Sequence, residues 1–362
     1  VNSGIGGDTA NGAMPRIAVD VAEYRPTWVF YHFGMNDVNR GAYVKDQSPE
    51  QERSAANAAW AFKHNVVSLS EQVRKAVPGV REMFASPTFY DDTADVTNMP
   101  KGATGWATVN QIGCNAALRR FGDFVEGVAA AKKAPFVDWH APLDGFVGRR
   151  RKAGDSHFMV TSWDRVHPGA VGHSIMAWTF LKAQGVPATV SDVTVDAAAG
   201  RTVCATNATV TDVVRTADGV ACTVLEKALP FPVPDEAREI LGEFDVEETL
   251  NREVFAVTGL KAGNYALLID GAEVATGDAA AFAKGIRLGF NEKTPQYAQA
   301  QKFFAENKRL ANRERKIRAY AWKAQNRGAS AREPILEAQR KLRELVRPVA
   351  HRYEVVEVET NN

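Results

Sequence analysis

An aspartate and a histidine three residues apart are the residues of this chain whose types and spacing best suit catalysis. Asp164 and His167 lie in the segment Ser162-Trp-Asp-Arg-Val-His-Pro-Gly169, and an apolar run with helical periodicity follows from Val171 to Phe180. A carboxylate placed here can accept a hydrogen bond from one imidazole nitrogen, which selects the tautomer and stabilises the imidazolium form. The other nitrogen can then remove a proton from a serine hydroxyl. The pair is therefore predicted to be a general base and its orienting partner.

Two other interpretations of these residues have to be compared with catalysis. A D-x-x-H pair is frequent by chance and can be a capping aspartate beside a surface histidine. Asp164, His167 and His173 could together bind a metal ion, but positions six residues apart on a helix point in different directions. We therefore rank metal binding below acid–base catalysis and expect no metal and no cofactor.

The elements that must position this pair follow the order strand, helix, strand, helix, with short links. This order is typical of a doubly wound parallel α/β sheet. The first strand, Trp28–Phe33, is a continuous apolar run, as expected of a strand buried on both faces. Further strands are expected at Arg81–Ser86 and Pro135–Trp139, with helices at Asn11–Tyr24, Pro49–Ala76 and about Asn110–Lys132.

Two segments near the predicted strands contain glycine and polar residues. Gly34-Met-Asn36-Asp37 follows the first strand, where open α/β sheets bind ligands, although Asn36 and Asp37 could simply cap the next turn. Gly4-Ile-Gly-Gly7-Asp8-Thr9 is predicted to be a turn whose backbone N–H groups can approach an anion. It has neither a G-K-[ST] nor a G-x-G-x-x-G pattern, so a phosphate loop is not predicted.

Three blocks of the sequence resemble the SGNH (GDSL-type) serine esterases and occur in the order of that family. They are Asn2-x-Gly4-Ile-Gly-Gly7-Asp-Thr9, Gly34-x-Asn36-Asp37 and Asp164-x-x-His167-Pro168. The resemblance covers residues 1 to about 187 and implies an α/β fold with a three-layer, doubly wound, flavodoxin-like parallel sheet. It also implies that the Gly7 N–H and the Asn36 side-chain amide are oxyanion-hole donors, with His167 as the base and Asp164 as its orienting partner.

The family's first block, a G-D-S that supplies the attacking serine, should precede the glycine turn. We therefore expect the sequence to be truncated at its N-terminus, the serine to lie upstream of Val1, and the chain as given to be inactive. Gly154-Asp155-Ser156 spells the same tripeptide, but it follows Arg149-Arg-Arg-Lys152 where an apolar strand is required, which indicates a chance match. We expect the basic run to be a solvated loop, with contact to an anionic or sugar-rich substrate as the alternative.

Composition excludes several other classes of protein. The 362 residues are 45% hydrophobic and 24% charged, with a net charge of +1, which is typical of a globular protein without a global field for nucleic acid or membranes. The sequence contains no run of 18 or more apolar residues, so no membrane span is predicted. The three cysteines show no metal-ligand spacing.

We predict three domains, at residues 1–187, 188–290 and 291–362. The second domain has segments that alternate with period two and a hairpin turn at Asp218-Gly219, so a small antiparallel β domain is expected. The third is predicted to be a helical hairpin, with helices from Thr294 to about Gln325 and from a Ser330–Glu333 capping box onward. Residues 352–358 alternate and could close the small sheet as an edge strand. Between residues 302 and 347 there are fourteen Lys or Arg and five Glu, but without a reading motif we expect a solvated face and no nucleic acid.

The predicted function is that of a serine ester hydrolase acting on a small acyl ester or an acylated carbohydrate. Family members with appended domains often act on acylated carbohydrates, so the resemblance suggests a carbohydrate O-acetyl esterase. A polysaccharide substrate favours a periplasmic or extracellular location. The alternative is a non-catalytic carbohydrate-binding or structural protein on an esterase-like fold. The sequence does not indicate an oligomeric state.

Overall fold

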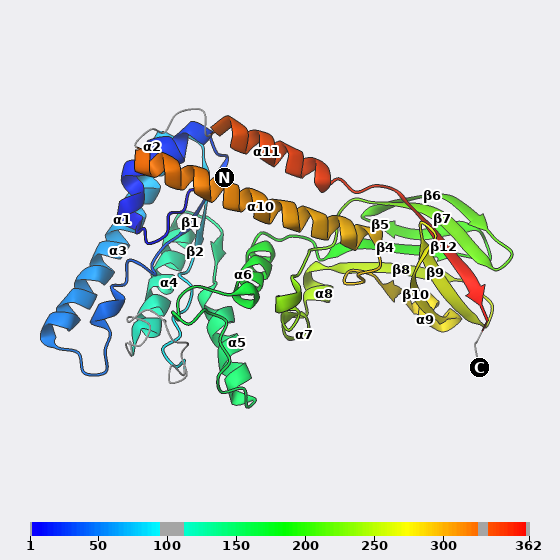
Figure 1. Cartoon of the computed structure of the whole chain (residues 1–362), viewed down its shortest axis with the longest axis horizontal. Helices are drawn as coiled ribbons and strands as arrows, with labels where there is room; N and C mark the ends of the chain where they lie inside the picture. The colour runs from blue at the N-terminus through cyan, green and yellow to red at the C-terminus, as the bar shows by residue number, and fades with distance from the viewer. Residues whose placement is uncertain (1, 95–111, 325–331, 360–362) are drawn as a thin grey trace. The chain divides into compact units, whose positions relative to one another are not determined.

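The structure is a computed structural model that describes residues 2–94, 112–324 and 332–359 (Figure 1). The chain divides into two compact units. Unit 1 consists of Val1–Gly185 and Pro234–Ile240, and unit 2 of Val186–Val233 and Leu241–Asn362. Each unit has its own cluster of buried apolar side chains.

A parallel sheet with strand order β1-β2-β3 forms the centre of unit 1, as the strand–helix alternation predicted. β1 (Trp28–His32) pairs with β2 (Arg81–Ala85), and β2 pairs with the short β3 (Phe136–Val137). The helices and 3₁₀ turns of the unit are α1 (Ala10–Ala13), η1 (Met14–Arg16), α2 (Ile17–Asp20), η2 (Ala22–Tyr24), η3 (Arg40–Ala42), α3 (Pro49–Ala76), α4 (Cys114–Ala131), α5 (His140–Lys152), α6 (Ala170–Ala183) and η5 (Asp235–Ala237).

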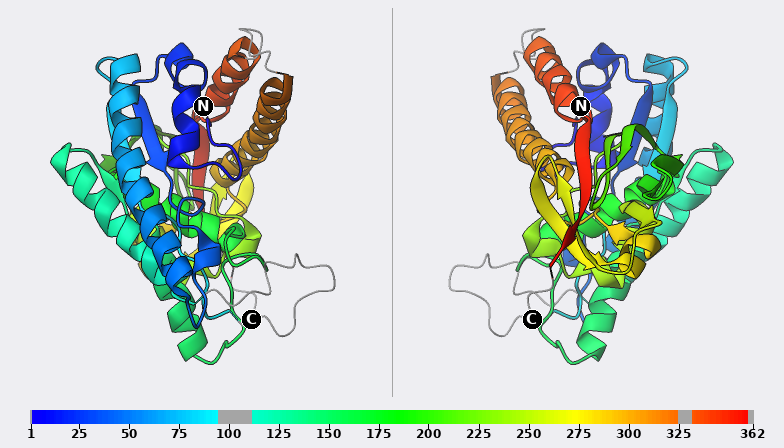
Figure 2. Two further views of the ribbon diagram at one scale, coloured as in Figure 1. Left: turned by 90° about the vertical axis from the view of Figure 1, so that its left-hand side faces the viewer. Right: turned by 90° about the vertical axis from the view of Figure 1, so that its right-hand side faces the viewer.

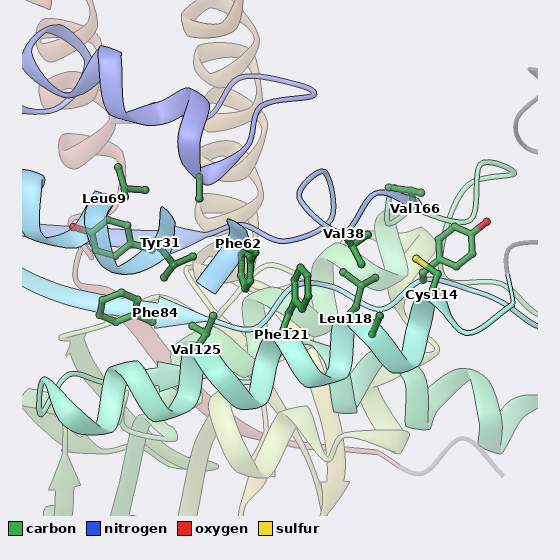
Figure 3. Close-up of a cluster of buried hydrophobic side chains, with 14 of the residues drawn as sticks. Tyr31, Val38, Phe62, Leu69, Phe84, Cys114, Leu118, Phe121, Val125 and Val166 are labelled. Atoms are coloured by element: carbon green, nitrogen blue, oxygen red, sulfur yellow. The ribbon is translucent and has the colours of Figure 1, made fainter. Parts of the chain in front are cut away.

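Helices cover both faces of this sheet. Successive residues of β2 point to opposite sides, so this strand contributes side chains to the core on each face. Phe84 packs into the cluster formed by α3 and α4, whereas Met83 and Ala85 belong to a cluster that Met176 and Phe180 of α6 complete. Figure 3 shows the first of these clusters. The helices α3 and α4 pack side by side in it (Figure 2), with stacked rings at Phe62 and Phe121, whose centroids lie 4.2 Å apart.

Local sequence signals explain where α3 begins and why the predicted helix at Asn11–Tyr24 is wrong. Ser48 accepts from the Gln51 backbone, and the Gln51 side chain accepts from the Ser48 N–H, so a complete capping box opens α3 at Pro49. The Asn11–Tyr24 segment is divided into short α and 3₁₀ turns. Pro15 lies inside it and lacks the N–H that a continuous helix requires.

Unit 2 contains two sheets that face each other across an apolar core. The five-stranded sheet has the order β10-β9-β12-β7-β6, and the four-stranded sheet has the order β11-β8-β4-β5. Buried side chains of both sheets share one cluster, in which the Phe255 and Tyr353 rings lie 4.9 Å apart. The strands are β4 (Thr189–Asp196), β5 (Arg201–Thr206), β6 (Ala208–Arg215), β7 (Gly219–Glu226), β8 (Arg252–Thr258), β9 (Asn264–Ile269), β10 (Ala272–Asp278), β11 (Ile286–Arg287) and β12 (His351–Val358).

Two details of these sheets differ from the sequence prediction. β4 and β8 pair in parallel, so the four-stranded sheet is mixed, whereas the pairs of the five-stranded sheet are antiparallel. The last strand, β12, is not an edge strand, because it pairs with β9 on one side and with β7 on the other. Tyr353 and Val355 of this strand are almost fully buried in the core.

The helices of unit 2 include the predicted pair near the C-terminus, α10 (Pro295–Ala324) and α11 (Arg332–Leu345). They run antiparallel, because the Gln299 amide near the start of α10 donates to the carbonyls of Leu345 and Arg347 at the end of α11. The predicted cap residue Ser330 lies outside the described residues. The remaining helices are α7 (Ile240–Glu243), α8 (Val246–Leu250) and α9 (Ala279–Lys284). Among the residues described, none of the helices combines the length and apolar character needed to cross a bilayer.

The core of unit 2 encloses two glutamates, Glu226 at the end of β7 and Glu253 on β8, which are 4% and 0% exposed. Within the described residues, neither carboxylate oxygen of Glu253 has a hydrogen-bond partner, so a negative charge on this group would be buried without compensation. Ser191 donates to Glu226 Oε1 at 2.7 Å. Burial raises the pKa of both groups, and the negative charge of Glu226 raises the pKa of Glu253 further. The folded unit therefore keeps a proton that the unfolded chain releases.

This pair predicts that unit 2 loses stability as the pH rises. The pKa of Glu253 in the folded unit lies above its unfolded value of about 4.3. The contribution of the retained proton to stability is therefore complete below that unfolded pKa and is lost as the pH rises towards the folded pKa. One retained proton corresponds to about 1.4 kcal/mol of unfolding free energy per pH unit in this window. Glu253→Gln, which stays neutral, should flatten the fall of the unfolding midpoint as the pH rises above the unfolded pKa. The exposed Glu273→Gln is the matched control, and equal pH dependence in both variants would contradict the prediction.

Candidate active site

The predicted catalytic pair is in contact in the structure. His167 Nδ1 lies 2.5 Å from Asp164 Oδ2, so one ring nitrogen is engaged by the carboxylate. The other oxygen, Oδ1, accepts from the backbone N–H groups of Val166 and His167, both at 2.9 Å. The Asp164 side chain is 20% exposed, whereas that of His167 is 75% exposed. This arrangement leaves His167 Nε2 as the ring nitrogen that the carboxylate does not engage.

The charge state of Asp164 follows from these contacts. Partial burial by itself raises the pKa of Asp164, but hydrogen bonds from the backbone and ring of His167, from the Ser162 hydroxyl and from the Val166 N–H lower it to about 2. The carboxylate is therefore ionised at neutral pH. An ionised carboxylate on Nδ1 stabilises a positive charge on the ring, which is the requirement for a general base.

The histidine loop, residues 162–167, is closed by its own backbone. Ser162 N–H donates to the His167 carbonyl at 2.7 Å, and Arg165 N–H donates to the Ser162 carbonyl at 2.9 Å. Thr161 and Pro168 form an isolated antiparallel bridge at the ends of the loop. This bridge holds Pro168 outside the following helix, and α6 begins at Ala170.

The glycine turn and the asparagine loop are joined to each other. The Asn36 amide donates through Nδ2 to the Asp8 carbonyl at 3.0 Å. Asp37 accepts from the Gly34 N–H and from the Ala10 N–H, each at 3.0 Å. Burial raises the pKa of Asp37, although these backbone hydrogen bonds act against the shift. The two segments that the family resemblance assigns to the oxyanion hole thus form one hydrogen-bonded unit.

Donors for an anion remain on these two segments. Gly7 is exposed, with φ at +81°, a backbone conformation that glycine adopts without strain. Within the part of the chain that the structure describes, no acceptor takes the Gly7 N–H. The Asn36 amide carries two hydrogens, and its hydrogen bond to the Asp8 carbonyl uses one of them. Both groups can therefore donate to a further acceptor.

Apolar residues next to the three predicted blocks meet in one cluster. Ala10 beside the glycine turn, Val38 beside the asparagine loop and Val166 of the histidine loop are all buried in the core of unit 1. Figure 3 shows Val38 and Val166 at the same end of this cluster, close to Cys114. The blocks are thus carried on a common part of the unit, although Gly7, Asn36 and His167 are linked through backbone segments and not by direct contacts between their side chains.

The alternative interpretations of the histidines, Ser156 and the basic run have different outcomes in the structure. In the described ranges, no group of three or more His, Cys, Asp or Glu side chains could hold a metal ion, so Asp164, His167 and His173 do not form such a site. Ser156 is exposed in a turn after α5. The basic run Arg149–Lys152 is not a loop but the last turn of α5, where cations are stabilised by the negative end of the helix dipole.

Sequence reasoning missed the residues beneath the histidine loop. Arg165 is 1% exposed, and its guanidinium lies over the Tyr90 ring at 5.3 Å from the centroid. Its carbonyl accepts from the Asp91 N–H at 3.1 Å. The only available signal was that Tyr90 and Asp91 follow a strand of the parallel sheet, where functional side chains gather.

Residues 1–175 match the sequence model of the GDSL-like Lipase/Acylhydrolase family, and this part of the chain belongs to that family. The match includes the glycine turn, the asparagine loop and the histidine loop. The family match and the similarity to an acetylxylan esterase support an ester hydrolase.

Two relatives illustrate how far the similarity extends. "Acetylxylan esterase" from Geobacillus stearothermophilus is 26% identical over 188 residues, which are 51% of this chain and 71% of that protein. A solved structure described as "BT4096 a gut microbial diltiazem-metabolizing enzyme" aligns with a TM-score of 0.80 at 26% identity, covering 98% of this chain and 89% of that one. The second similarity therefore includes unit 2, so the β-rich and helical regions also occur together in a known protein.

Proposed function

We propose that this protein is a serine ester hydrolase of the GDSL type that removes acyl groups, foremost O-acetyl groups, from carbohydrates. The observation that carries the proposal is the 2.5 Å contact between His167 Nδ1 and the ionised Asp164 carboxylate within the family's histidine block. Such a contact fixes the tautomer that leaves Nε2 as a proton acceptor. The doubly wound, three-layer arrangement of the family is part of the proposal.

Each assigned residue has one role in this reaction. His167 takes the proton of the attacking serine and later gives it to the leaving alcohol, while Asp164 holds the ring and balances its charge. The tetrahedral oxyanion accepts hydrogen bonds from the Gly7 N–H, the Asn36 amide and the N–H of the serine. For the attacking serine we propose the family's G-D-S block, which precedes the glycine turn in that family. Water then attacks the acyl-enzyme, again with His167 as the base, and no cofactor takes part in these steps.

The substrate class is supported by similarity and not by a visible sugar site. The relative from Geobacillus stearothermophilus is named for acetylxylan, an acetylated polysaccharide. With 26% identity over half of this chain, the same class of substrate is a reasonable first choice. The acyl group is expected to be small, and the alcohol to be a sugar hydroxyl.

The test is acetate release by a polypeptide that carries the G-D-S block together with the chain described here. Acetylated xylo-oligosaccharides and p-nitrophenyl acetate are the two substrates. Hydrolysis of both supports the proposal, and hydrolysis of p-nitrophenyl acetate alone supports the esterase but rejects the carbohydrate. Binding of the oligosaccharide without hydrolysis of either substrate would favour a non-catalytic binding protein.

A further inference from the structure

The histidine loop has one exposed and one buried side, and its orientation depends on the buried side. His167 is 75% exposed and is held by Asp164 within the same loop. Arg165 and Val166, in contrast, are 1% and 6% exposed. Arg165 and Val166 lie between Asp164 and His167 in the chain, so their attachment determines both where the loop lies relative to the sheet and how the two paired side chains face each other.

Arg165 is attached to the segment that follows β2. Its backbone has φ at +63°, a left-handed conformation that an arginine rarely adopts and that its surroundings must maintain. The Arg165 carbonyl accepts from the Asp91 N–H at 3.1 Å, and the guanidinium lies over the ring of Tyr90. The position of Asp91 therefore determines the position of the middle of the histidine loop.

The carboxylate of Asp91 forms an ion pair with the guanidinium of Arg151, at the end of α5. Its two carboxylate oxygens accept from Arg151 Nη1 at 2.9 Å and from Nη2 at 2.7 Å, and Asp91 is 1% exposed. The same guanidinium donates from Nε and Nη2 to the Phe158 carbonyl, at 3.0 and 2.8 Å. Phe158 lies on the segment that leads into the histidine loop. One arginine thus holds both the approach to the loop and the residue on which the loop rests.

An open cavity explains why this position needs an ion pair. Tyr90, Asp91 and Arg151 line a cavity of about 660 Å³ between α4 and α5, together with His140 and Asp144. Asp91 lines this cavity although it is itself only 1% exposed, so its buried charge requires a partner. A buried two-bond pair between a carboxylate and a guanidinium is directional, so it can hold Asp91 in one orientation.

We propose that Arg151, acting through Asp91, is a positioning residue that holds the histidine loop and so keeps His167 aligned by Asp164. The expected effect on the rate rests on the proposed function, whereas the expected effect on the position of the histidine loop does not. Small displacements of a catalytic group by distant changes can lower a rate by about 10²-fold. We call the two hydrogen bonds from the Arg151 guanidinium to the Asp91 carboxylate the clamp. They depend on the planar, two-pronged guanidinium group, which a lysine ammonium cannot reproduce although it keeps the charge.

The experiment compares Arg151→Lys with Arg150→Lys in the full chain. Arg150 lies on the same turn of α5 and is also ion-paired, with Asp155 at 3.0 Å and Glu239 at 3.2 Å, but not with Asp91. The first readout is the tautomer of His167, given by the ¹⁵N shifts of its ring nitrogens and assigned with His167→Ala. The wild type and Arg150→Lys should show the Nδ1–H tautomer, and Arg151→Lys a mixture with the Nε2–H form. The second readout is kcat for p-nitrophenyl acetate, measured on the polypeptide that carries the G-D-S block. Arg151→Lys should lower this kcat about 10²-fold at a nearly unchanged KM.

The outcomes separate the clamp from the esterase. If Arg151→Lys keeps the near-ultraviolet circular dichroism, the His167 tautomer and the kcat of the wild type, the clamp is wrong. If the wild type hydrolyses no ester, the proposed function fails, and the tautomer still decides on the clamp. Should Arg151→Lys not fold, the isosteric Asp91→Asn decides, because it keeps the backbone N–H bond to Arg165 and weakens only the grip of Arg151. The clamp then requires a mixed His167 tautomer in Asp91→Asn, and an unchanged tautomer overturns it.

Discussion

Replacing His167 by alanine is expected to lower kcat for p-nitrophenyl acetate by about 10⁴-fold, the upper range for loss of a general base. Without the imidazole, the serine hydroxyl has to lose its proton to water, and the ionised Asp164 has no ring to orient. Because the His167 side chain is 75% exposed and makes few packing contacts, the variant should fold as the wild type does. The measurement is kcat on the polypeptide with the serine block, alongside the thermal unfolding midpoint.

The matched control for this variant is His173→Ala. His173 is also exposed and its Nδ1 contacts the Gly169 carbonyl at 3.0 Å, at the start of the helix that follows the histidine loop. It should retain nearly all activity. Equal rates in His167→Ala and the wild type would remove His167 from the mechanism, whereas equal losses in both histidine variants would indicate damage to the loop and not loss of a base.

Asn36→Ala is expected to lower kcat by about 10² to 10³-fold with little change in KM, because an oxyanion donor acts mainly in the transition state. The loss corresponds to about 3–4 kcal/mol of transition-state stabilisation. Asn36 also holds the Asp8 carbonyl at 3.0 Å, so part of the effect will come from a looser glycine turn. A fall of kcat without a comparable fall of the unfolding midpoint identifies the electrostatic part.

A second asparagine on the same loop provides the control for Asn36. Asn39 donates to Ser54 Oγ at 2.8 Å and has φ at +53°. Asn39→Gly removes this side chain and keeps a left-handed backbone at low cost. It should lose less than tenfold in kcat, on the order of the loss of one surface hydrogen bond. An Asn36→Ala variant as active as Asn39→Gly would exclude Asn36 from the oxyanion hole.

The features that the sequence predicted correctly depend on local spacing. A carboxylate and an imidazole only three residues apart in a short loop lie within reach of each other, and in the structure they are in contact. The alternation of strands with long helices specifies a parallel sheet with helices on both faces. The expectation that the strand at Trp28–Phe33 is buried on both faces is wrong, because Trp28 and Phe30 are 43% and 37% exposed. The start of α3 was readable for the same reason, because its capping box lies within four consecutive residues.

The features that the sequence did not predict depend on pairs far apart in the chain. Arg151 and Asp91 are separated by 60 residues, and no motif links them. A signal for α5 was present, since Leu143, Phe146 and Val147 are buried at helical spacing, but the four basic residues after them suggested a loop. Likewise, alternation in residues 352–358 indicates a strand and does not indicate its neighbours, which only the register with β7 and β9 defines.

The central place of β12 also governs when unit 2 can form during synthesis. β7 and β9 have no hydrogen-bonded contact with each other in the sheet, since β12 lies between them. While the ribosome is still translating the helices α10 and α11, both strands carry unpaired backbone groups along the edge that β12 will later occupy. Unit 2 can therefore be completed only after residue 358 has emerged, whereas the described residues of unit 1 have all been made by residue 240. The two units of one polypeptide thus become foldable at very different moments of its translation.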